Sequence, residues 1–346
     1  MATEALDRLV PLTVLTGFLG AGKTTLLNRL LQAPEMARTA VLINEFGEMG
    51  LDHLLVENLE DDAILLQAGC LCCTIRGDLS AALARLAERM QAGQAVDRVV
   101  LETTGLADPV PILQTLLADP LAQRHFALAG VVTLVDGANG LATLERQPEA
   151  VRQVAVADRL LVSKPDLAGA AALEALLERL RDLNPGVVPV LAEHGAAPAE
   201  ALLGARRFEA ADRGETVRGW LDPAGWDAHA HHHHHHDRNR HDAGIEAFCL
   251  SYDTPLNWQG IGTWLEMLTA TRGESLLRVK GILDLKGQDK PVAIHGVQHV
   301  WHAPVLLSGW PDGEPRRSRI VFIVRNLPRA VVEDGLAAFI GAAETA

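Results

Sequence analysis

Short apolar runs alternate with longer amphipathic stretches over the first part of the chain. The apolar runs, which are rich in β-branched residues, are 12–16, 39–44, 96–102, 130–136, 159–164 and 187–192. Between several of them apolar residues recur at helical spacing, as in residues 25–31, 79–90 and 168–183. Strands that alternate with helices in this way predict an α/β fold with a mostly parallel sheet flanked by helices.

A second pattern begins at residue 245. Four segments read as strands and two as helices, in the order strand 245–253, helix 258–273, strands 276–287, 291–304 and 318–326, and helix 329–343. This order predicts a small C-terminal α+β domain. The stretch before it is rich in Pro, Gly, His and charged residues and lacks periodicity, which is typical of a linker. We therefore predict a first domain over residues 1–215, a His-rich linker over 216–244 and a second domain over 245–346.

Composition narrows the class of protein. The chain has 346 residues and a formal net charge of −13, and this acidic balance argues against nucleic-acid binding, which needs a basic face. No apolar run approaches the roughly 20 residues of a membrane span, and the N-terminal residues lack the apolar region of a signal peptide. We expect a cytoplasmic protein with no nucleic-acid and no membrane partner.

Residues 17–24 read G-F-L-G-A-G-K-T, which fits the phosphate-binding pattern G-x-x-x-x-G-K-[ST]. An expected strand precedes this segment and an expected helix follows it, as the pattern requires. Its glycines let backbone N–H groups converge on phosphate oxygens at a helix N-terminus. Lys23 would reach the β- and γ-phosphates, and the Thr24 hydroxyl would hold Mg²⁺.

Two later segments add candidate nucleotide contacts. In "LETTG" (101–105), Glu102 ends an expected strand and could order Mg²⁺ or a water, while the Gly105 N–H could sense a γ-phosphate. In "SKPD" (163–166), the Asp166 carboxylate could accept from guanine N–H groups while the Lys164 stem covers the ring. Taken alone, each segment also fits an ordinary loop, and the phosphate loop upstream favours the nucleotide interpretation.

Three of the four cysteines, Cys70, Cys72 and Cys73, fall within "GCLCC". Thiolates are soft ligands that suit Zn²⁺, Cu⁺ and tetrahedral Co²⁺. Closed structural zinc sites use four protein ligands, so three thiolates in a tight loop would leave one position open for Glu45 or for a group from a partner. A redox switch and simple burial are the alternatives for these cysteines.

The phosphate loop, "NEFGEMGLDHLLVE", "GCLCC", "ETTG" and "SKPD" together resemble the CobW-like family of P-loop GTPases, which are metal-trafficking relatives of the urease and hydrogenase nickel-insertion GTPases. The resemblance covers nearly the whole chain and implies a P-loop GTPase domain followed by the family's C-terminal domain. It implies GTP hydrolysis with catalytic roles for Lys23 and Glu102, and we expect the intrinsic rate to be slow because the sequence offers no obvious arginine finger. The nucleotide-binding residues that it implies are Gly17, Gly20, Ala21, Gly22, Lys23, Thr24, Thr25, Gly105, Ser163, Lys164 and Asp166.

The same resemblance implies the metal chemistry. Mg²⁺ would be held by Thr24, Asp52 and Glu102, and the segment with Glu45, Glu48 and Asp52 would link nucleotide to metal. The chain departs from the family at Ser163, because the guanine motif commonly starts with an Asn whose amide would brace the loop. This departure leaves the preference for GTP over ATP open.

The position of the cysteines between the phosphate loop and "ETTG" predicts nucleotide control, because P-loop GTPases carry segments there that move when the γ-phosphate is lost. We expect GTP and Mg²⁺ to gather the thiolates into a tight Zn²⁺ site and hydrolysis to weaken it. The metal would pass to a client metalloprotein, and a homodimer is compatible with the sequence. Alternatives are a Co²⁺ chaperone for cobalamin synthesis or nitrile hydratase activation, and a metal storage or buffering protein. Low-affinity ligands would come from His231, His232, His233, His234, His235 and His236.

Overall fold

The expected parallel sheet is present in a computed structural model of the chain, which describes residues 9–44, 64–68, 75–185, 187–192, 197, 244–310 and 315–345. The chain divides into two compact units, Met1–Arg179 with Val187–Arg207, and Leu180–Gly186 with Phe208–Ala346. Among the described residues, no helix is both long and apolar enough to cross a membrane.

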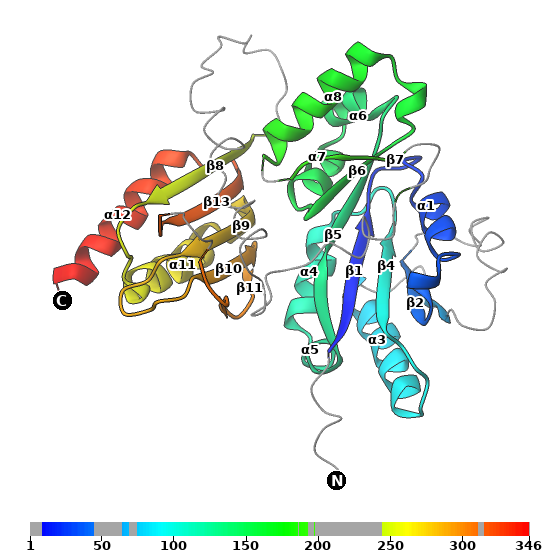
Figure 1. The fold of residues 1–346 in the computed structure, drawn as a ribbon, viewed down its shortest axis with the longest axis horizontal. Coiled ribbons are helices and arrows are strands. Elements are labelled where there is room, and N and C mark those ends of the chain that lie inside the picture. The colour runs from blue at the N-terminus through cyan, green and yellow to red at the C-terminus, as the bar shows by residue number, and fades with distance from the viewer. Residues whose placement is uncertain are drawn as a thin grey trace. The chain divides into compact units, whose positions relative to one another are not determined.

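In the part of the chain that the structure describes, the first unit is built on a sheet of seven parallel strands in the order β3-β2-β4-β1-β5-β6-β7 (Figure 1). The strands are β1 Val10–Thr16, β2 Thr39–Asn44, β3 Ile64–Ala68, β4 Arg98–Thr103, β5 Phe126–Asp136, β6 Arg159–Ser163 and β7 Val190–Ala192. The central strands are buried almost continuously, as expected of parallel strands that are covered on both faces. Because all strands run in one direction, their carboxyl ends share one edge of the sheet, which is where α/β proteins bind ligands.

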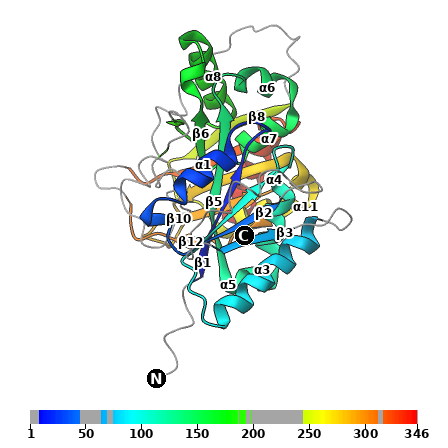
Figure 2. The ribbon, with the colours of Figure 1, turned by 90° about the vertical axis from the view of Figure 1, so that its right-hand side faces the viewer.

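Helices surround this sheet, and Figure 2 shows α1, α3 and α8 around its strands. The helices are α1 Lys23–Leu30, α3 Ile75–Gln91, α4 Pro109–Ala118, α5 Pro120–His125, α6 Gly140–Arg146, α7 Pro148–Ala155 and α8 Ala170–Leu183, with short 3₁₀ turns Pro34–Met36 and Pro165–Leu167. One core cluster joins α1 to the sheet through buried residues such as Leu26, Leu27 and Val100. This packing fixes the start of α1 next to the end of β1.

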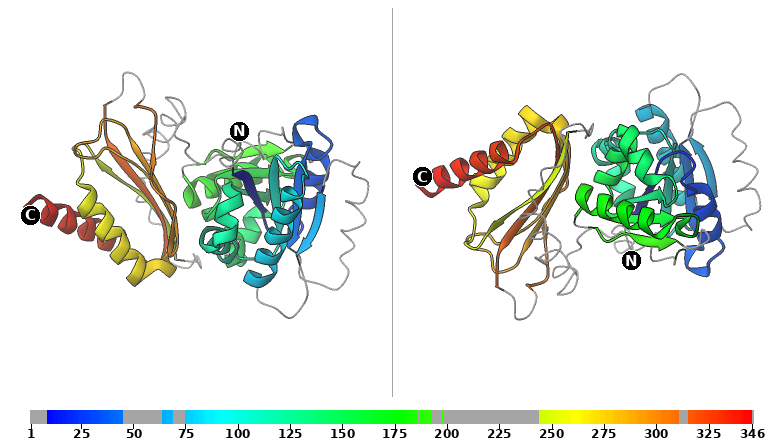
Figure 3. Two further views of the ribbon diagram at one scale, coloured as in Figure 1. Left: turned by 90° about the horizontal axis from the view of Figure 1, so that it is seen from below. Right: turned by 90° about the horizontal axis from the view of Figure 1, so that it is seen from above.

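The second unit has an antiparallel sheet with the path β11-β10-β9-β13-β8, and β12 pairs with β10. Its strands are β8 Ile245–Tyr252, β9 Leu276–Leu283, β10 Val292–Val297, β11 Val300–Trp301, β12 Val305–Leu306 and β13 Ser318–Arg325. Its helices, α11 Trp258–Arg272 and α12 Arg329–Thr345, lie on one face of this sheet (Figure 3), and a 3₁₀ turn Gly273–Ser275 follows α11. The predicted fold class, a parallel α/β domain plus a small α+β domain, is confirmed.

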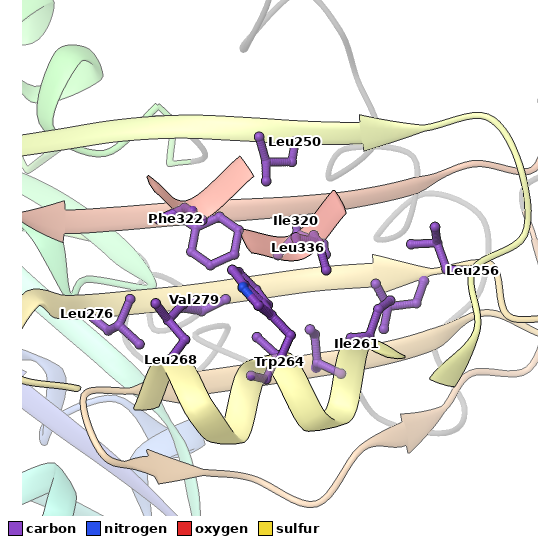
Figure 4. Packing of buried hydrophobic residues seen from close by; sticks show 14 of the residues in the cluster. Leu250, Leu256, Ile261, Trp264, Leu268, Leu276, Val279, Ile320, Phe322 and Leu336 are labelled. Atoms are coloured by element: carbon purple, nitrogen blue, oxygen red, sulfur yellow. The ribbon is translucent and has the colours of Figure 1, made fainter. Parts of the chain in front are cut away.

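Trp264 is the centre of the core between this sheet and its helices. It is 1% exposed and meets the ring of Phe322 edge-on, with centroids 5.9 Å apart. Figure 4 shows the two side chains pointing toward each other from α11 and β13. Phe248 stacks on Phe322 with centroids 5.5 Å apart. Truncation of such a buried aromatic residue typically costs about 3–5 kcal/mol. The buried cluster around Trp264 lies entirely within the second unit, which therefore has a hydrophobic core of its own.

Candidate nucleotide-binding site

The phosphate loop joins the end of β1 to the start of α1 and contains three glycines with positive φ angles. Gly17 has φ 144°, and a Cβ atom at this position would lie 2.2 Å from the carbonyl oxygen of Leu134 on β5. Gly20 and Gly22 have φ 77° and 91°, which is the left-handed region that favours glycine. Only glycine therefore fits the close approach at Gly17, and this is the physical reason for the first glycine of the motif.

The side chain of Lys23 folds back onto the start of the phosphate loop. Its Nζ atom donates to the carbonyl oxygen of Gly17 at 2.8 Å and lies 3.4 Å from that of Phe18, and the side chain is buried. Buried ammonium groups need such acceptors. The lysine thus holds the loop in a curved shape at the N-terminus of α1, where backbone N–H groups and the helix dipole favour an anion.

Thr24 connects the loop to the end of β4. Its Oγ1 atom donates to Glu102 Oε1 at 2.9 Å, and Glu102 is 6% exposed. The next residue of β4, Thr103, donates through Oγ1 to Thr16 Oγ1 on β1 at 2.8 Å. One hydroxyl oxygen and one carboxylate oxygen therefore lie side by side, and oxygen ligands of this kind are those that Mg²⁺ prefers. The predicted partners of Mg²⁺ that the structure describes are thus brought together.

Gly105 lies directly against the phosphate loop. A Cβ atom on Gly105 would lie 2.6 Å from the backbone N and Cα atoms of Leu19. Gly105 is buried, whereas Leu19, against which it packs, is 69% exposed and Leu106, the next residue in the chain, is 60% exposed. The E-T-T-G segment therefore reaches the loop at its glycine, as expected of a group that could sense a bound phosphate.

Ser163 braces the phosphate loop from the end of β6. Its hydroxyl donates to the carbonyl oxygen of Ala21 at 2.7 Å and lies 3.3 Å from that of Val135. Sequence comparison with the family motif leads us to expect a missing brace at this position, because serine lacks the amide of asparagine. The structure corrects that expectation, since the shorter side chain makes the contact through its hydroxyl.

Lys164, the residue after β6, makes the second contact with the phosphate loop. Its Nζ donates to the carbonyl oxygen of Gly20 and to Asp136 Oδ2, both at 2.7 Å. Burial raises the pKa of Asp136, but the hydrogen bond and charge of Lys164 and the N–H groups of Asn139 and Ala138 outweigh it and leave this pKa below its ordinary value. The lysine is therefore held in place by an ionised aspartate.

Asp136 and Gln153 are site residues to which sequence reasoning gave no role. A cavity of about 310 Å³ lies beside the phosphate loop and includes both of them in its lining, together with Phe18, Leu19, Leu144 and Lys164. Asp136 is the last residue of β5, and a polar residue at the end of a buried strand was the sequence feature that could have identified it as a site residue. Gln153 lies on the buried side of α7 among apolar residues, and a polar residue in such a pattern was the only sign of its role.

The remaining predicted residues divide into two groups. Thr25 and Asp166 are exposed on α1 and on the turn Pro165–Leu167. The others lie outside the described residues: Glu45, Glu48, Asp52, Cys70, Cys72, Cys73 and His231, His232, His233, His234, His235 and His236. Within the ranges that the structure describes, no group of three or more His, Cys, Asp or Glu side chains could hold a metal ion.

Ser163 and Lys164 make the phosphate loop and the S-K-P-D segment one connected unit at the carboxyl edge of the sheet. This arrangement on a parallel sheet defines a P-loop protein of the GTPase class. The model of the family "CobW/HypB/UreG, nucleotide-binding domain" matches residues 11–190, and that of the "Cobalamin synthesis protein cobW C-terminal domain" matches residues 245–340. The chain therefore belongs to the CobW/HypB/UreG family of GTPases.

Individual relatives agree with this assignment. "Zinc chaperone YjiA" of Escherichia coli (strain K12) is 32% identical over 337 residues, which cover 96% of this chain and 98% of that protein. "Zinc-regulated GTPase metalloprotein activator 1" of Schizosaccharomyces pombe is 36% identical over 182 residues, 51% of this chain and 44% of that protein. The crystal structure of Zn(II)-bound YjiA GTPase from E. coli superposes with a TM-score of 0.71 at 27% identity, covering 96% of this chain and 99% of that one.

Proposed function

We propose that this GTPase is a metallochaperone that binds Zn²⁺ through Cys70, Cys72 and Cys73 and transfers it to a client metalloprotein under the control of the bound nucleotide. The relatives named as a zinc chaperone and as a zinc-regulated GTPase metalloprotein activator support the choice of metal and the existence of a client. The chemistry supports it too, because three thiolates suit Zn²⁺ and leave one ligand position for exchange.

The position of β3 is the observation that carries the proposal. Residue Ala68, at the carboxyl end of β3, is in register with Asn44 of β2, which is in register with Thr103 of β4. Neighbouring strands are about 4.8 Å apart, so this end of β3 lies roughly 10 Å from the end of β4 that carries Glu102. Cys70 follows Ala68 by two residues, a span of about 7 Å at most. We therefore expect the start of the cysteine motif near the edge of the sheet that carries the phosphate loop.

Nucleotide binding would follow from the described geometry. The backbone N–H groups of the loop would bind the phosphates, with Lys23 supplying a positive charge. Thr24 and Glu102, with Asp52 as a further predicted ligand, would hold Mg²⁺, which would neutralise charge on the phosphates. Lys164 and Asp166 would take the guanine base. The side chains present fit Mg²⁺, because both described donors are oxygen atoms 2.9 Å apart.

Cobalt spectroscopy tests the metal half of the proposal. Co²⁺ added to the full chain with GTP and Mg²⁺ is expected to give a sulfur-to-cobalt charge-transfer band that disappears when Cys70, Cys72 and Cys73 are all changed to Ser. Cys249→Ser is the matched control, because Cys249 lies on β8 of the second unit and its loss should leave the band unchanged. A band that survives the triple substitution contradicts the proposed ligands.

GTP turnover separates a chaperone from a storage protein. Turnover that changes with added Zn²⁺ is expected of a chaperone, because its nucleotide and metal sites are coupled. Turnover that ignores Zn²⁺ and Co²⁺ alike would favour metal storage, with the nucleotide as a stabilising ligand. A response to Co²⁺ in place of Zn²⁺ would favour the cobalt chaperone.

A further inference from the structure

Gln153 is a buried polar residue on the last turn of α7. Only 1% of its surface is exposed, and Val151 and Val154 beside it are buried apolar residues. Its side-chain Nε2 atom donates to the carbonyl oxygen of Ala107 at 3.0 Å and to that of Gly105 at 3.2 Å. A buried amide is costly unless it is hydrogen-bonded, and the nitrogen of this one finds acceptors in the loop that follows β4, whereas its Oε1 atom has no partner among the described residues.

The surroundings of Gln153 fix α7 to the sheet and to this loop at further points. The backbone oxygen of Gln153 accepts from Thr133 Oγ1 on β5 at 2.7 Å, which fixes the helix to the sheet. Arg152 Nε lies 3.0 Å from Asp108 Oδ2, and Asp108 caps α4 by accepting from the Val110 N–H at 3.0 Å. The loop from Gly105 to Asp108 is therefore held at both of its ends by neighbouring residues of one helix.

Gly105 is confined from the other side as well. A Cβ atom would meet the backbone of Leu19 at 2.6 Å, so Gly105 lies between the phosphate loop and the amide of Gln153. Fixing the Gly105 carbonyl removes rotational freedom from the residue whose N–H could meet a γ-phosphate. A preformed contact of this kind costs less entropy when the ligand binds.

We propose that Gln153 is a positioning residue that holds Gly105 in place for the γ-phosphate and thereby sets the preference for GTP over GDP. The inference rests on the proposed function, namely nucleotide binding at this loop, and on the expectation from the sequence that the Gly105 N–H contacts the γ-phosphate. GDP lacks that phosphate, so its affinity would depend on the phosphate loop, Mg²⁺ and the contacts to the guanine base, and not on a contact with the Gly105 N–H. In this proposal the amide of Gln153 acts through Gly105, because the hydrogen bonds that it donates go to backbone carbonyl oxygens of the loop.

Binding of GTPγS and GDP to the full chain, measured by calorimetry, tests this inference. Gln153→Met keeps the length and burial of the side chain and removes its two donated hydrogen bonds. We expect the affinity for GTPγS to fall about tenfold and that for GDP to change less than about twofold. The matched control is Thr133→Val, which removes one buried hydrogen bond to the same helix and should leave the ratio of the two affinities unchanged.

A second variant guards against loss of folding. Arg152→Gln removes the contact with Asp108, and we expect about a threefold loss of GTPγS affinity with GDP affinity unchanged. Equal losses for both nucleotides in Gln153→Met, or an unchanged ratio in Arg152→Gln, would overturn the inference. If the unaltered chain fails to bind GTPγS, the proposed function itself is contradicted; if it binds and the ratio stays constant in the variants, this inference alone is wrong.

Discussion

Thr24 donates a hydrogen bond to Glu102 across 2.9 Å, and this contact joins the start of α1 to the end of β4. The two residues are 78 positions apart in the chain, yet they place a hydroxyl and a carboxylate oxygen at one point beside the phosphate loop. The same edge of the sheet carries Ser163 and Lys164, which hold the loop from β6. The candidate nucleotide-binding residues therefore lie together where β1, β4 and β6 end.

The charge of Glu102 is the first target. Glu102→Gln keeps the shape and the acceptor for Thr24 but removes the negative charge that would attract Mg²⁺. We expect Mg²⁺-dependent GTP turnover to fall about a hundredfold or more, with nucleotide affinity in the absence of Mg²⁺ changed little. Steady-state phosphate release at several Mg²⁺ concentrations measures this. The control is Asp97→Asn, which removes an acid from an exposed ion pair with Arg38 and should leave turnover unchanged.

The brace at Ser163 gives a second prediction. Ser163→Ala leaves the buried carbonyl oxygen of Ala21 without this donor, and one such hydrogen bond contributes about 1 kcal/mol. GTP affinity should therefore fall about fivefold, because the loop is less well held. Ser163→Asn should recover part of the loss if its amide reaches the same oxygen. Full wild-type affinity in Ser163→Ala, measured by calorimetry, would show that the brace has no effect on binding.

Gly17 tests the close approach of the loop to β5. Gly17→Ala introduces a Cβ atom 2.2 Å from the carbonyl oxygen of Leu134 at a φ of +144°. We expect a loss of about 3 kcal/mol or more in the free energy of unfolding, from steric overlap and backbone strain together. Gly93→Ala is the matched control, because Gly93 has φ +99° and open space around the added atom, so only about 1–2 kcal/mol of strain is expected. Equal losses in urea titrations would refute the steric explanation.

The ion pair between Asp136 and Lys164 predicts a pH dependence. The pKa of Asp136 is lower in the folded protein than in the unfolded chain, so its contribution to stability is present above the ordinary carboxyl pKa of about 4. That contribution is lost as the pH falls through the lowered, folded-state pKa. Asp136→Asn should therefore show a shallower loss of stability between about pH 5 and pH 2 than the unaltered chain. Parallel urea-unfolding curves for both proteins across this range would contradict it.

Local sequence patterns predicted those strands and motifs whose defining residues, an apolar run or a set of glycines, lie within one short segment. β1 and β6 appear where continuous apolar runs place them, and Gly17–Lys23 folds as its glycines require. β3, Ile64–Ala68, was missed, because its run of large apolar residues, Ile64–Leu66, is too short to distinguish a strand from a loop segment. β7 covers only Val190–Ala192 of the longer run that suggested it.

Contacts between distant residues could not be predicted in the same way. Gln153 is 48 positions from Gly105, and nothing near Gln153 in the sequence identifies its acceptors. Ser163 stands where the family motif has asparagine, and this suggested a missing hydrogen bond to the phosphate loop. The sequence could not show that the serine hydroxyl reaches Ala21, because the distance from β6 to the loop is a property of the folded sheet. Sequence therefore supplied the chemical groups of the site, and the fold supplied the distances that connect them.

The central claim is that the bound nucleotide controls the affinity for Zn²⁺, and a competitive Zn²⁺ titration tests it most directly. The full chain would be titrated against a chromophoric chelator with GTPγS and Mg²⁺, with GDP and Mg²⁺, and without nucleotide, beside the Cys70, Cys72 and Cys73 to Ser variant. We predict one tight site per chain that binds at least about tenfold more tightly in the GTPγS state, a coupling of about 1.4 kcal/mol, and that is absent in the variant. Equal Zn²⁺ affinity in all three states would contradict the account.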